Sequence, residues 1–324
     1  MSRLTFLDQD LSFMLIKSTA APMALLIAAC AASSSIAQPT SAASADDTPV
    51  HLAPVIVTGR LNPRDAAVIE AADRLSQRAG ATTVVSAEDF ENGRAATLAD
   101  IMQFAPGVYA QARHGEEVRF SIRGSGIQRG FLMRGVQLYQ DGVPLNLADG
   151  SGDYQSIDPL ALQHIEVWRG ANALEYGSST LGGAVNFVTP TGRGADPMTM
   201  RADAGAHGQQ RGHVMVAGAK DALDGMLSLT HGRQDGWRDH SMTEATRVSG
   251  NIGYRFSDTL EGRLYLTHVS SDLQLPGSLS RAVLSINRRQ AAQNSAAQNA
   301  GNYYTLDRAA ARLAWRPSDR LQIT

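Results

Sequence analysis

From residue 198 to the end of the sequence, apolar and polar side chains alternate in a series of short segments. In the first segment, Met198 and Met200 alternate with Thr199 and Arg201. A period of two places successive side chains on opposite faces of a β-strand. We therefore predict seven strands, close to residues 198–204, 212–218, 225–231, 249–256, 262–269, 307–316 and 320–324. Helix signals are nearly absent from this part of the sequence.

The connections between these predicted strands have two lengths. Short turns are predicted at residues 257–259 and 317–319, whereas residues 232–246 and 270–306 are longer connections. Outer-membrane barrels have short turns on one side and long loops on the other. A soluble β-sandwich has the same alternation of side chains, but the unequal connections favour a transmembrane barrel.

Composition limits the classes of partner and of membrane segment. The 324 residues carry a formal net charge of -2, with 43% hydrophobic and 19% charged residues. A nearly neutral chain has no electrostatic basis for binding nucleic acid or another polyanion. The sequence contains no uninterrupted apolar stretch of about 18 residues, so it predicts no transmembrane helix. Barrel strands remain compatible with this composition, because their residues alternate.

The N-terminus has the features of an export signal, which we assign to residues 1–37. Positive charge precedes the short apolar run 20–32, and Ser35-Ile36-Ala37 supplies a cleavage pattern of small residues. Met14 is an alternative start that gives a signal of more usual length. A buried N-terminal helix is the other interpretation, but Pro22 would weaken it.

Cys30 is the only cysteine and lies inside the apolar run. The stretch Ile27-Ala28-Ala29-Cys30 resembles a bacterial lipoprotein cleavage box, so lipidation of Cys30 is an alternative fate. If cleavage instead follows Ala37, the mature chain has no thiol. Disulfides and cysteine-based metal or redox sites are then excluded.

Residues 38–62 are predicted to be a flexible segment that contains one strand-like run. The stretch up to residue 50 is rich in Ala, Ser, Thr and Asp and has no apolar periodicity. The run that follows includes Pro54, Val55, Ile56, Val57 and Thr58. Because a short β-branched run in a flexible segment cannot bury itself, we expect it to join the edge of a neighbouring sheet or of a partner's sheet.

Residues 63–192 are predicted to form a separate α+β domain. Ser86 and Thr97 each precede a helical pattern and are followed three residues later by a carboxylate, which indicates two short helices. Residues 118–123 alternate as a strand. The Asp141-Gly142 pair predicts a hairpin turn.

No nucleotide, metal or catalytic motif is complete in this domain. Residues 177–182 have the glycine spacing of a phosphate-binding loop, but Gly183 and Ala184 stand where Lys and Ser or Thr are required. Arg129 occupies the position of the third glycine of a dinucleotide fingerprint. Zinc-hydrolase and esterase motifs are absent. We therefore predict no catalytic residue, no metal ligand, no cofactor and no enzymatic activity.

A series of motifs, in this order and spacing, resembles the plug domain of TonB-dependent outer-membrane receptors. The motifs are Ala96-Thr97-Leu98-Ala99-Asp100-Ile101-Met102, Ala105-Pro106-Gly107-Val108, Ile122-Arg123-Gly124, Tyr139-Gln140-Asp141-Gly142-Val143-Pro144, Ile165-Glu166-Val167-Trp168-Arg169-Gly170, Tyr176-Gly177 and Gly182-Gly183-Ala184-Val185-Asn186. The run Val55-Ile56-Val57-Thr58 resembles a TonB box. Leu275-Pro276-Gly277-Ser278-Leu279 is similar to a segment of iron-chelate members of this family, including ferric-dicitrate-like ones.

The resemblance implies an exported receptor of the outer membrane that takes up a ferric siderophore or a similar iron chelate, with lipid around its barrel. TonB is the implied energy-coupling partner, and it would bind Pro54, Val55, Ile56, Val57 and Thr58 by strand addition. For the substrate, the resemblance implies loops that carry Arg113, His114, Gln128 and Arg129.

Seven residues are predicted to pack the plug against the barrel. Glycines allow tight turns with little side-chain bulk, and buried charges require partners. These residues are Arg123, Glu166, Arg169, Gly170, Gly177, Gly182 and Gly183. The alternative for the charged side chains is ordinary exposure to solvent.

Seven strands are too few for a plugged transporter barrel, which has about 22. We therefore expect residues 193–324 to be the first part of a barrel that is truncated in this chain. The alternative is a plug-like periplasmic binding protein, or a broken receptor remnant, that does not transport.

Overall fold

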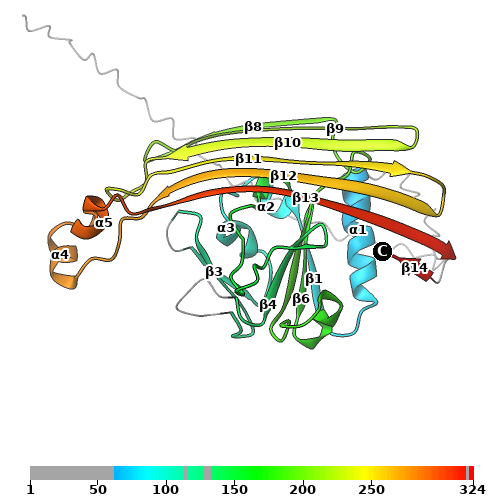
Figure 1. Ribbon diagram of the computed structural model, residues 1–324, viewed down its shortest axis with the longest axis horizontal. Coiled ribbons are helices and arrows are strands. Elements are labelled where there is room, and N and C mark those ends of the chain that lie inside the picture. Colours follow the sequence, from blue (N-terminus) through cyan, green and yellow to red (C-terminus); the bar gives the residue numbers. More distant parts are fainter. Residues whose placement is uncertain (1–61, 113–114, 127–132, 319–320) are drawn as a thin grey trace, which may run out of the picture. The chain divides into compact units, whose positions relative to one another are not determined.

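The computed structural model describes residues 62–112, 115–126, 133–318 and 321–324, all of which belong to one compact unit, Thr58–Thr324. The predicted signal peptide and the predicted TonB box, residues 54–58, lie outside the described residues. The unit contains an α+β domain that is followed by a seven-stranded antiparallel sheet (Figure 1). The prediction of an α+β domain followed by antiparallel strands is therefore confirmed.

The centre of the α+β domain is a five-stranded sheet with the strand order β1-β6-β7-β4-β5. Its strands are β1 (Ala81–Ser86), β4 (Val136–Gln140), β5 (Val143–Pro144), β6 (His164–Arg169) and β7 (Gly183–Val188). Strands β4 and β7 are parallel, whereas the other neighbours are antiparallel. A separate ribbon pairs β2 (Val108–Ala112) with β3 (Val118–Ile122).

The predicted Asp-Gly hairpin is confirmed between β4 and β5. Asp141 and Gly142 have φ values of 53° and 82°. Both values lie in the left-handed region that the central residues of this tight hairpin turn require, and that Asp and Gly tolerate better than most residues.

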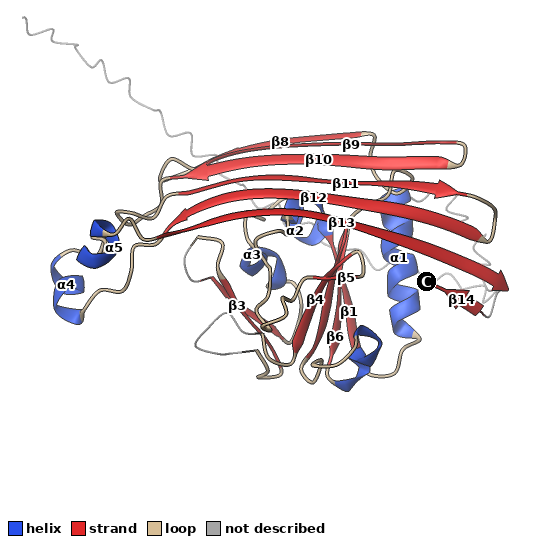
Figure 2. Cartoon of the chain, in the orientation of Figure 1, coloured by secondary structure: helices blue, strands red, loops and turns tan. Residues whose placement is uncertain are grey.

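Three α-helices and two short 3₁₀-helices accompany the five-stranded sheet (Figure 2). They are α1 (Pro63–Ser76), α2 (Ala87–Glu91), α3 (Leu98–Met102), Pro159–Ala161 and Ala171–Tyr176. Before α2, the Asp89 carboxylate accepts a hydrogen bond of 3.0 Å from the Ser86 N–H. Before α3, the Asp100 carboxylate accepts one of 2.8 Å from the Thr97 N–H. Both predicted helix starts are confirmed, and α1 is an element that the sequence patterns did not predict.

The core of the α+β domain lies between the five-stranded sheet and the short helices. Strand β6 has buried residues on both of its faces, and Trp168 within it is fully buried. Phe90 of α2, Ile101 of α3, and Ile165 of β6 belong to the same hydrophobic cluster. Their burial is the main source of stability, because apolar area removed from water contributes roughly 25 cal/mol per Å².

The seven-stranded sheet has the order β14-β13-β12-β11-β10-β9-β8, so every strand pairs with its sequence neighbours. The strands are β8 (Met198–Ala204), β9 (Gln210–Lys220), β10 (Leu223–Gln234), β11 (Thr243–Arg255), β12 (Leu260–Gln274), β13 (Gly301–Ser318) and β14 (Leu321–Ile323). All seven predicted strands are therefore found. Within the described residues, β8 and β14 each pair with one strand only, so the sheet is not closed.

The two faces of this sheet have opposite chemistry. One face exposes large apolar side chains: Met198, Met200, Val216, Leu227, Leu229, Ile252, Leu264, Leu266 and Leu313. The opposite face buries polar side chains: His213, Ser228, Thr230, Arg247, Ser249, Asn251, Arg263, Thr267 and Ser271. A soluble sandwich buries its apolar face, whereas a membrane barrel turns that face toward lipid. The observed arrangement matches the membrane barrel.

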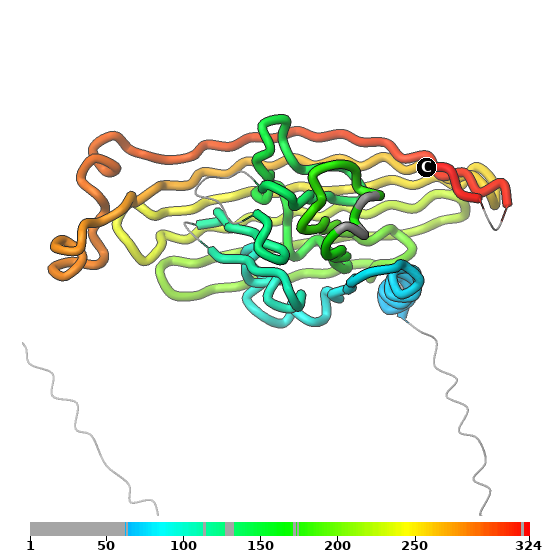
Figure 3. Tube along the Cα trace, turned by 90° about the horizontal axis from the view of Figure 1, so that it is seen from below, coloured from blue at the N-terminus to red at the C-terminus, as the bar shows by residue number. Residues whose placement is uncertain are grey.

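The strand connections differ in length at the two ends of the sheet. Residues 221–222 and 256–259 form short turns at one end, and residues 235–242 and 275–300 form longer connections at the other. The longest connection contains α4 (Arg281–Ile286) and α5 (Gln293–Ala297) (Figures 1 and 3). In the part of the chain that the structure describes, no helix is long and apolar enough to cross a membrane.

Candidate functional site

Two arginines of the seven-stranded sheet hold the turn 91–95 of the α+β domain, and we call this pair the arginine clamp. Arg201 of β8 and Arg211 of β9 each donate to two backbone carbonyl oxygens of the turn. The acceptors are Glu91 and Gly93 (2.7 Å) for Arg201, and Arg94 (2.7 Å) and Ala95 (2.6 Å) for Arg211. Because a guanidinium presents several donors in a fixed plane, each clamp arginine satisfies two carbonyls at once.

Asp203 of β8 orients both clamp arginines. Its carboxylate accepts hydrogen bonds of 2.9 Å from Nε of Arg201 and 2.8 Å from Nε of Arg211. Nη2 of each arginine also lies close to this carboxylate, at 2.9 Å for Arg201 and 2.6 Å for Arg211, and the same two atoms donate to carbonyls of the turn. Charge-assisted bonds of this kind are roughly twice as strong as neutral ones, so Asp203 preorganises the clamp.

Arg247 of β11 reaches across to the loop after β2. It forms an ion pair with Glu116, and its Nε donates a hydrogen bond of 2.8 Å to the carbonyl oxygen of Gln155. Only 8% of Arg247 is exposed. A buried guanidinium is costly unless it is paired, so Glu116 is the counter-ion that allows Arg247 to occupy this position.

Asp158 connects the α+β domain to β9 and β10 through a chain of hydrogen bonds. The Thr230 hydroxyl donates to Asp158 Oδ2 at 2.5 Å, and Nδ1 of His213 lies 2.7 Å from the same hydroxyl oxygen. Since the only proton of the hydroxyl is directed to the carboxylate, Nδ1 must be the donor to Thr230. All three residues are buried.

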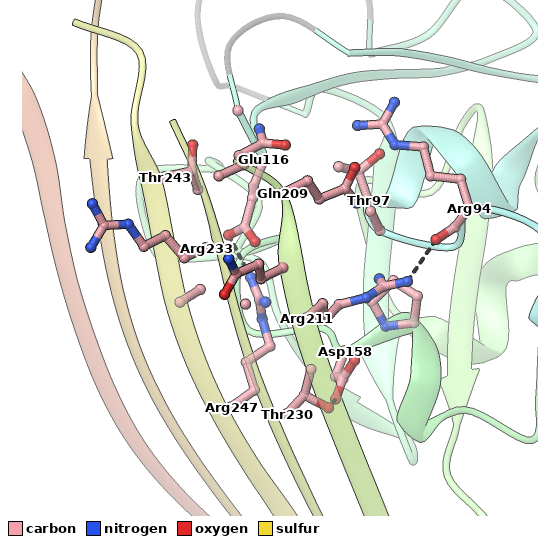
Figure 4. A pocket seen from close by; sticks show the side chains of 17 residues that line it. Arg94, Thr97, Glu116, Asp158, Gln209, Arg211, Thr230, Arg233, Thr243 and Arg247 are labelled. Carbon is pink, nitrogen blue, oxygen red and sulfur yellow. Dashed lines mark hydrogen bonds and ion pairs between the residues drawn. The ribbon is translucent and has the colours of Figure 1, made fainter. Parts of the chain in front are cut away.

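These contacts surround a small cavity between the α+β domain and the seven-stranded sheet (Figure 4). Its volume is about 70 Å³, and its lining includes Arg94, Glu116, Asp158, Arg211 and Arg247. Figure 4 shows Glu116 and Arg247 pointing toward each other across it. A space of this size holds a few water molecules. The cavity therefore belongs to the interface, and it has no room for a metal chelate.

A second group of contacts lies beside the Asp141 turn. The Thr189 N–H and hydroxyl donate to the two oxygens of Asp141 at 2.8 and 2.9 Å. Asn251 of β11 donates to the Pro190 carbonyl at 3.0 Å, and Arg308 of β13 donates to the Gln140 side chain at 2.5 Å. The turn is thereby joined to the polar face of the sheet.

Asp141 makes stability dependent on pH. Part of Asp141 is exposed, but its carboxyl group is enclosed. Burial raises the pKa of Asp141 from 3.8 to about 6, although the hydrogen bonds from Thr189 act to lower it. The folded state therefore binds the proton more tightly than the unfolded state does. Below pH about 4, this tighter binding of the proton adds roughly 3 kcal/mol to the free energy of unfolding. The added stability is lost as the pH rises to about 6.

We expect the Asp141→Asn variant to lose this pH dependence. Asn tolerates the positive φ of the turn and cannot ionise. Denaturant unfolding at pH 4.0 and pH 6.5 should show a smaller difference in the free energy of unfolding for the variant than for the parent protein. An equal difference in both proteins would show that Asp141 is not the group responsible.

Glu166 of β6 has its partners inside the α+β domain, whereas a contact with the barrel strands was expected. Its carboxylate forms an ion pair with Arg74 of α1 and accepts a hydrogen bond of 2.9 Å from the Asn186 side-chain amide. It also lies 3.6 Å from Nε2 of His164. Burial alone would raise the pKa of Glu166, but the hydrogen bond from His164, the charge of Arg74 and the amide of Asn186 hold it below its usual value. Glu166 thus stabilises the domain as a buried carboxylate.

Arg123, Arg169 and Gly170 also lie together inside this domain. Arg169 Nη2 donates to the Thr83 hydroxyl at 2.6 Å. Burial and the neighbouring charge of Arg123 lower the pKa of Arg169. Gly170 has φ 84°, and a Cβ there would lie 2.5 Å from Nη1 of Arg123. These three residues therefore pack against one another.

The other predicted glycines include two that are closely enclosed. A Cβ at Gly183 would lie 2.0 Å from the Trp168 carbonyl oxygen, and one at Gly182 would lie 2.4 Å from Ser125 Cβ. Both neighbours belong to the α+β domain. Gly177 has φ 86° and open space around it, so its glycine serves the turn conformation.

We expect the Gly183→Ala variant to destabilise the α+β domain by roughly 3–5 kcal/mol, because the methyl group displaces the backbone of β6 and the φ of 145° is strained for Ala. Gly177→Ala is the matched control and should cost only roughly 1–2 kcal/mol, since it incurs the φ strain alone. Urea unfolding followed by the fluorescence of the buried Trp168 measures both. Equal losses in the two variants would contradict this account.

The predicted substrate residues Arg113, His114, Gln128 and Arg129 lie outside the described residues, so their role stays a prediction. The residues that join the two parts were not singled out from the sequence: Arg201, Asp203, Arg211, His213, Asp158 and Arg247. Alternation does place the strand members on the polar face. It gives no indication of which groups of the α+β domain they meet.

Comparison with known proteins identifies a family for the α+β domain. Residues 74–184 match the model of the TonB-dependent receptor plug domain. The chain is 24% identical over 249 residues to the vitamin B12 transporter BtuB of Vibrio vulnificus (strain CMCP6), which covers 68% of this chain and 40% of that protein. It is 28% identical over 168 residues to a ferric aerobactin receptor of Escherichia coli, which covers 50% of this chain and 22% of that receptor. The chain thus spans less than half the length of both relatives.

Two solved structures have the same fold over about three quarters of the chain. The unliganded ferric citrate transporter FecA has a TM-score of 0.64 at 23% identity and covers 76% of this chain and 39% of its own. The siderophore receptor PirA from Acinetobacter baumannii has a TM-score of 0.55 at 20% identity. The match covers 75% of this chain and 38% of the PirA chain. At such identities, the likeness establishes the fold.

Proposed function

We propose that this chain, in which residues 74–184 form the plug domain of a TonB-dependent receptor, belongs to an outer-membrane receptor that takes up a ferric siderophore or a similar iron chelate. Residues 1–37 would direct export, and Pro54, Val55, Ile56, Val57 and Thr58 would bind TonB. The plug domain (the α+β domain described above) would close the lumen of the barrel in the absence of transport.

The observation that carries this proposal is the position of the plug domain against the polar face of the seven-stranded sheet. The clamp arginines and Arg247 extend from that face to plug groups. The opposite face exposes Leu227, Leu229 and similar side chains, which suits contact with lipid. A polar lumen filled by a folded domain is the arrangement that a gated receptor needs.

An iron chelate is the proposed substrate on the basis of the relatives' names and of one segment. A ferric citrate transporter, a siderophore receptor and a ferric aerobactin receptor are among the similar proteins. The segment 275–279, which is similar to a segment of iron-chelate receptors, lies in the longest connection of the sheet. A corrinoid, as for the Vibrio relative, is the competing substrate class.

Transport also requires a closed barrel. Two unpaired sheet edges in lipid would leave backbone groups without hydrogen bonds, each at a cost of several kcal/mol. We propose that further strands complete the wall in the transport-competent receptor. The buried contacts at Asp158, Glu116 and the turn 91–95 then have to loosen before a chelate can pass beside the plug domain.

A pull by TonB on residues 54–58 would first reach Arg64 in α1. Arg64 pairs with Glu91 at 2.7 Å and lies 3.4 Å from Asp196. The Glu91 carbonyl accepts in turn from the clamp residue Arg201. A force applied to the N-terminal segment would therefore act directly on the contacts that hold the turn 91–95 to the wall.

The direct test is ligand binding by the outer-membrane receptor that contains this chain. After fractionation of the envelope and purification in detergent, the protein would be titrated with ⁵⁵Fe-labelled citrate, aerobactin and ferrioxamine, and with labelled cyanocobalamin. Saturable binding of at least one ferric chelate supports the proposal. Binding of cyanocobalamin alone would move the receptor to the corrinoid class, and recovery only from the soluble periplasm would favour a plug-like binding protein.

A further inference from the structure

Three arginines lie at regular intervals along the polar face of β13. Arg308 reaches the plug domain, where its guanidinium donates to the Gln140 side chain at 2.5 Å. Residues four and eight positions further along a strand share the same face, so Arg312 and Arg316 also lie on the polar face. At roughly 3.3 Å per residue, neighbouring members of this row are about 13 Å apart along the strand. We call Arg308, Arg312 and Arg316 the arginine stripe.

The arginine stripe extends from the plug domain to the short-turn end of the sheet. Arg308 lies near the middle of β13, whereas the Arg316 N–H donates to the carbonyl oxygen of Thr259, in the short turn 256–259, at 2.7 Å. In Figure 3, which is seen from the side of the plug domain, that domain crosses the middle of β13 and leaves its short-turn end uncovered. Outer-membrane barrels have their short turns on the periplasmic side, so the stripe extends toward the periplasm.

The two members of the stripe beyond the plug domain retain donors for a ligand. Within the described residues, neither Arg312 nor Arg316 forms an ion pair with a carboxylate, and both residues are exposed. Arg312 contacts the Tyr265 side chain, and Nε of Arg316 donates to the Gln322 side chain at 3.2 Å. Arg263 on the same face, by contrast, pairs with two carboxylates. Because a guanidinium has five N–H donors, most donors of Arg312 and Arg316 remain for an anion.

The carboxylates of this region do not cancel the charge of the stripe. Among the described residues they are Asp224 and Glu261 on the sheet, Asp141 and Asp153 in the plug domain, and Asp258 in the turn 256–259. Both sheet carboxylates pair with Arg263, and both plug carboxylates act on the charge of Arg308. Arg255 of β11 adds another exposed guanidinium at the short-turn end. This end therefore has more unpaired guanidiniums than unpaired carboxylates, which raises the local concentration of anions.

We propose that the arginine stripe is a transit path, along which an anionic ferric chelate moves from the plug domain to the periplasm, and that it favours uptake of anionic over cationic chelates. The inference rests on the proposed function and deepens it. The planar guanidinium matches the geometry of a ligand carboxylate. Conduction requires sites that bind favourably enough for entry and weakly enough for release. A row of exposed single arginines meets this requirement better than a closed pocket does.

The plug domain controls access to the first arginine of the stripe. In the described arrangement, Arg308 is engaged by Gln140 and by the charges of Asp141 and Asp153. Gln140 and Asp141 are neighbours at the end of β4, so a displacement of this turn removes both from Arg308 together. Arg308 can then bind a carboxylate of the chelate in their place. Transit therefore begins only after the plug domain has moved.

The test measures the maximal rate of ⁵⁵Fe accumulation by cells that express the receptor containing this chain. The variants are Arg312→Gln, Arg316→Gln, the double substitution, and Arg312→Lys, which keeps the charge. Lys220→Gln is the matched control, because Lys220 is an exposed cation near the same end of the sheet but on the apolar face. The probes are ferric citrate and ferric aerobactin, which are anionic, and ferrioxamine, which is cationic.

We expect each single glutamine variant to lower the maximal rate for the anionic probes about threefold, and the double variant to lower it about tenfold. Arg312→Lys and Lys220→Gln should match the parent protein, and the rate for ferrioxamine should not fall in any variant. The affinity of surface binding, measured in de-energised cells, should stay unchanged, because a chelate bound outside has not reached the stripe.

The outcomes separate the two proposals. The transit path is wrong, and the receptor function stands, if the double variant accumulates the anionic chelates like the parent protein, if the anionic probes and ferrioxamine are slowed equally, if surface binding is weakened instead of the rate, or if the parent protein accumulates ferrioxamine alone. If no ferric probe accumulates in a TonB-dependent manner, both proposals fail. The heat-modifiable migration and the amount of each variant in the outer membrane establish that a lower rate is not a loss of folding.

Discussion

Replacing Ile56 with proline is expected to abolish TonB-dependent uptake and to leave binding of the ligand at the cell surface unchanged. Strand addition depends on main-chain hydrogen bonds between residues 54–58, the proposed TonB box, and the edge of the partner's sheet. Proline removes one N–H donor and fixes φ, so it disrupts the added strand where a side-chain substitution would not. Ile56→Val is the matched control, because it keeps the backbone donor and the β-branched shape.

The measurement compares ⁵⁵Fe accumulation with ⁵⁵Fe binding in de-energised cells. The proline variant should accumulate no more iron than cells that lack TonB, whereas the valine variant should match the parent protein. Normal accumulation by the proline variant would show that residues 54–58 are not the coupling segment. A loss of both binding and uptake would instead indicate that the receptor fails to assemble.

Breaking the ion pair between Glu116 and Arg247 is expected to destabilise the contact between the plug domain and the sheet by roughly 3–5 kcal/mol, because it leaves one buried charge without its partner. Arg247→Met leaves the Glu116 carboxylate, whose side chain is only 14% exposed, without a counter-ion. The double variant Arg247→Met, Glu116→Leu should recover most of the loss, since neither charge remains.

Arg233→Met is the control for this experiment. Arg233 lines the same cavity, but its side chain is 57% exposed and its ionic partners are 3.7 and 3.9 Å away. An exposed pair contributes roughly 0–1 kcal/mol, so this variant should unfold like the parent protein. A double-mutant cycle measured by denaturant unfolding gives the coupling free energy. A cycle without coupling would show that the pair does not hold the plug domain in place.

Local sequence patterns were sufficient to predict the strands, because each strand depends on its own side chains. The alternation at Leu227, Ser228 and Leu229 assigns one side chain to each face without knowledge of the rest of the fold. The hairpin at Asp141 and Gly142 was predictable for the same reason, since its positive φ values are a local requirement.

The partners of buried charges could not be predicted in this way, because they depend on distant parts of the chain. Glu166 was expected to face the barrel, yet the residues it contacts include Arg74, which lies in a helix that the sequence patterns did not indicate. Similarly, no local pattern connects Arg211 with the carbonyls of the turn 91–95. Such contacts follow from the packing of complete elements.

The sequence patterns also did not predict the helix and the contacts of the longest connection. Residues 291–299 have the composition of a solvated low-complexity stretch, but α5 forms within them. The exposed guanidinium of Arg288 and the half-exposed Trp237 come together because Arg238 joins two connections that are separate in the sequence. Contacts between connections therefore follow from the fold and not from local motifs.

The most direct test of the central claim is the accumulation of ⁵⁵Fe from a chelate by cells that express the receptor containing this chain, measured with and without TonB. We predict saturable accumulation that requires both the receptor and TonB, and that unlabelled chelate competes away. Accumulation that is equal in the two strains, or no greater than in cells without the receptor, would contradict the account.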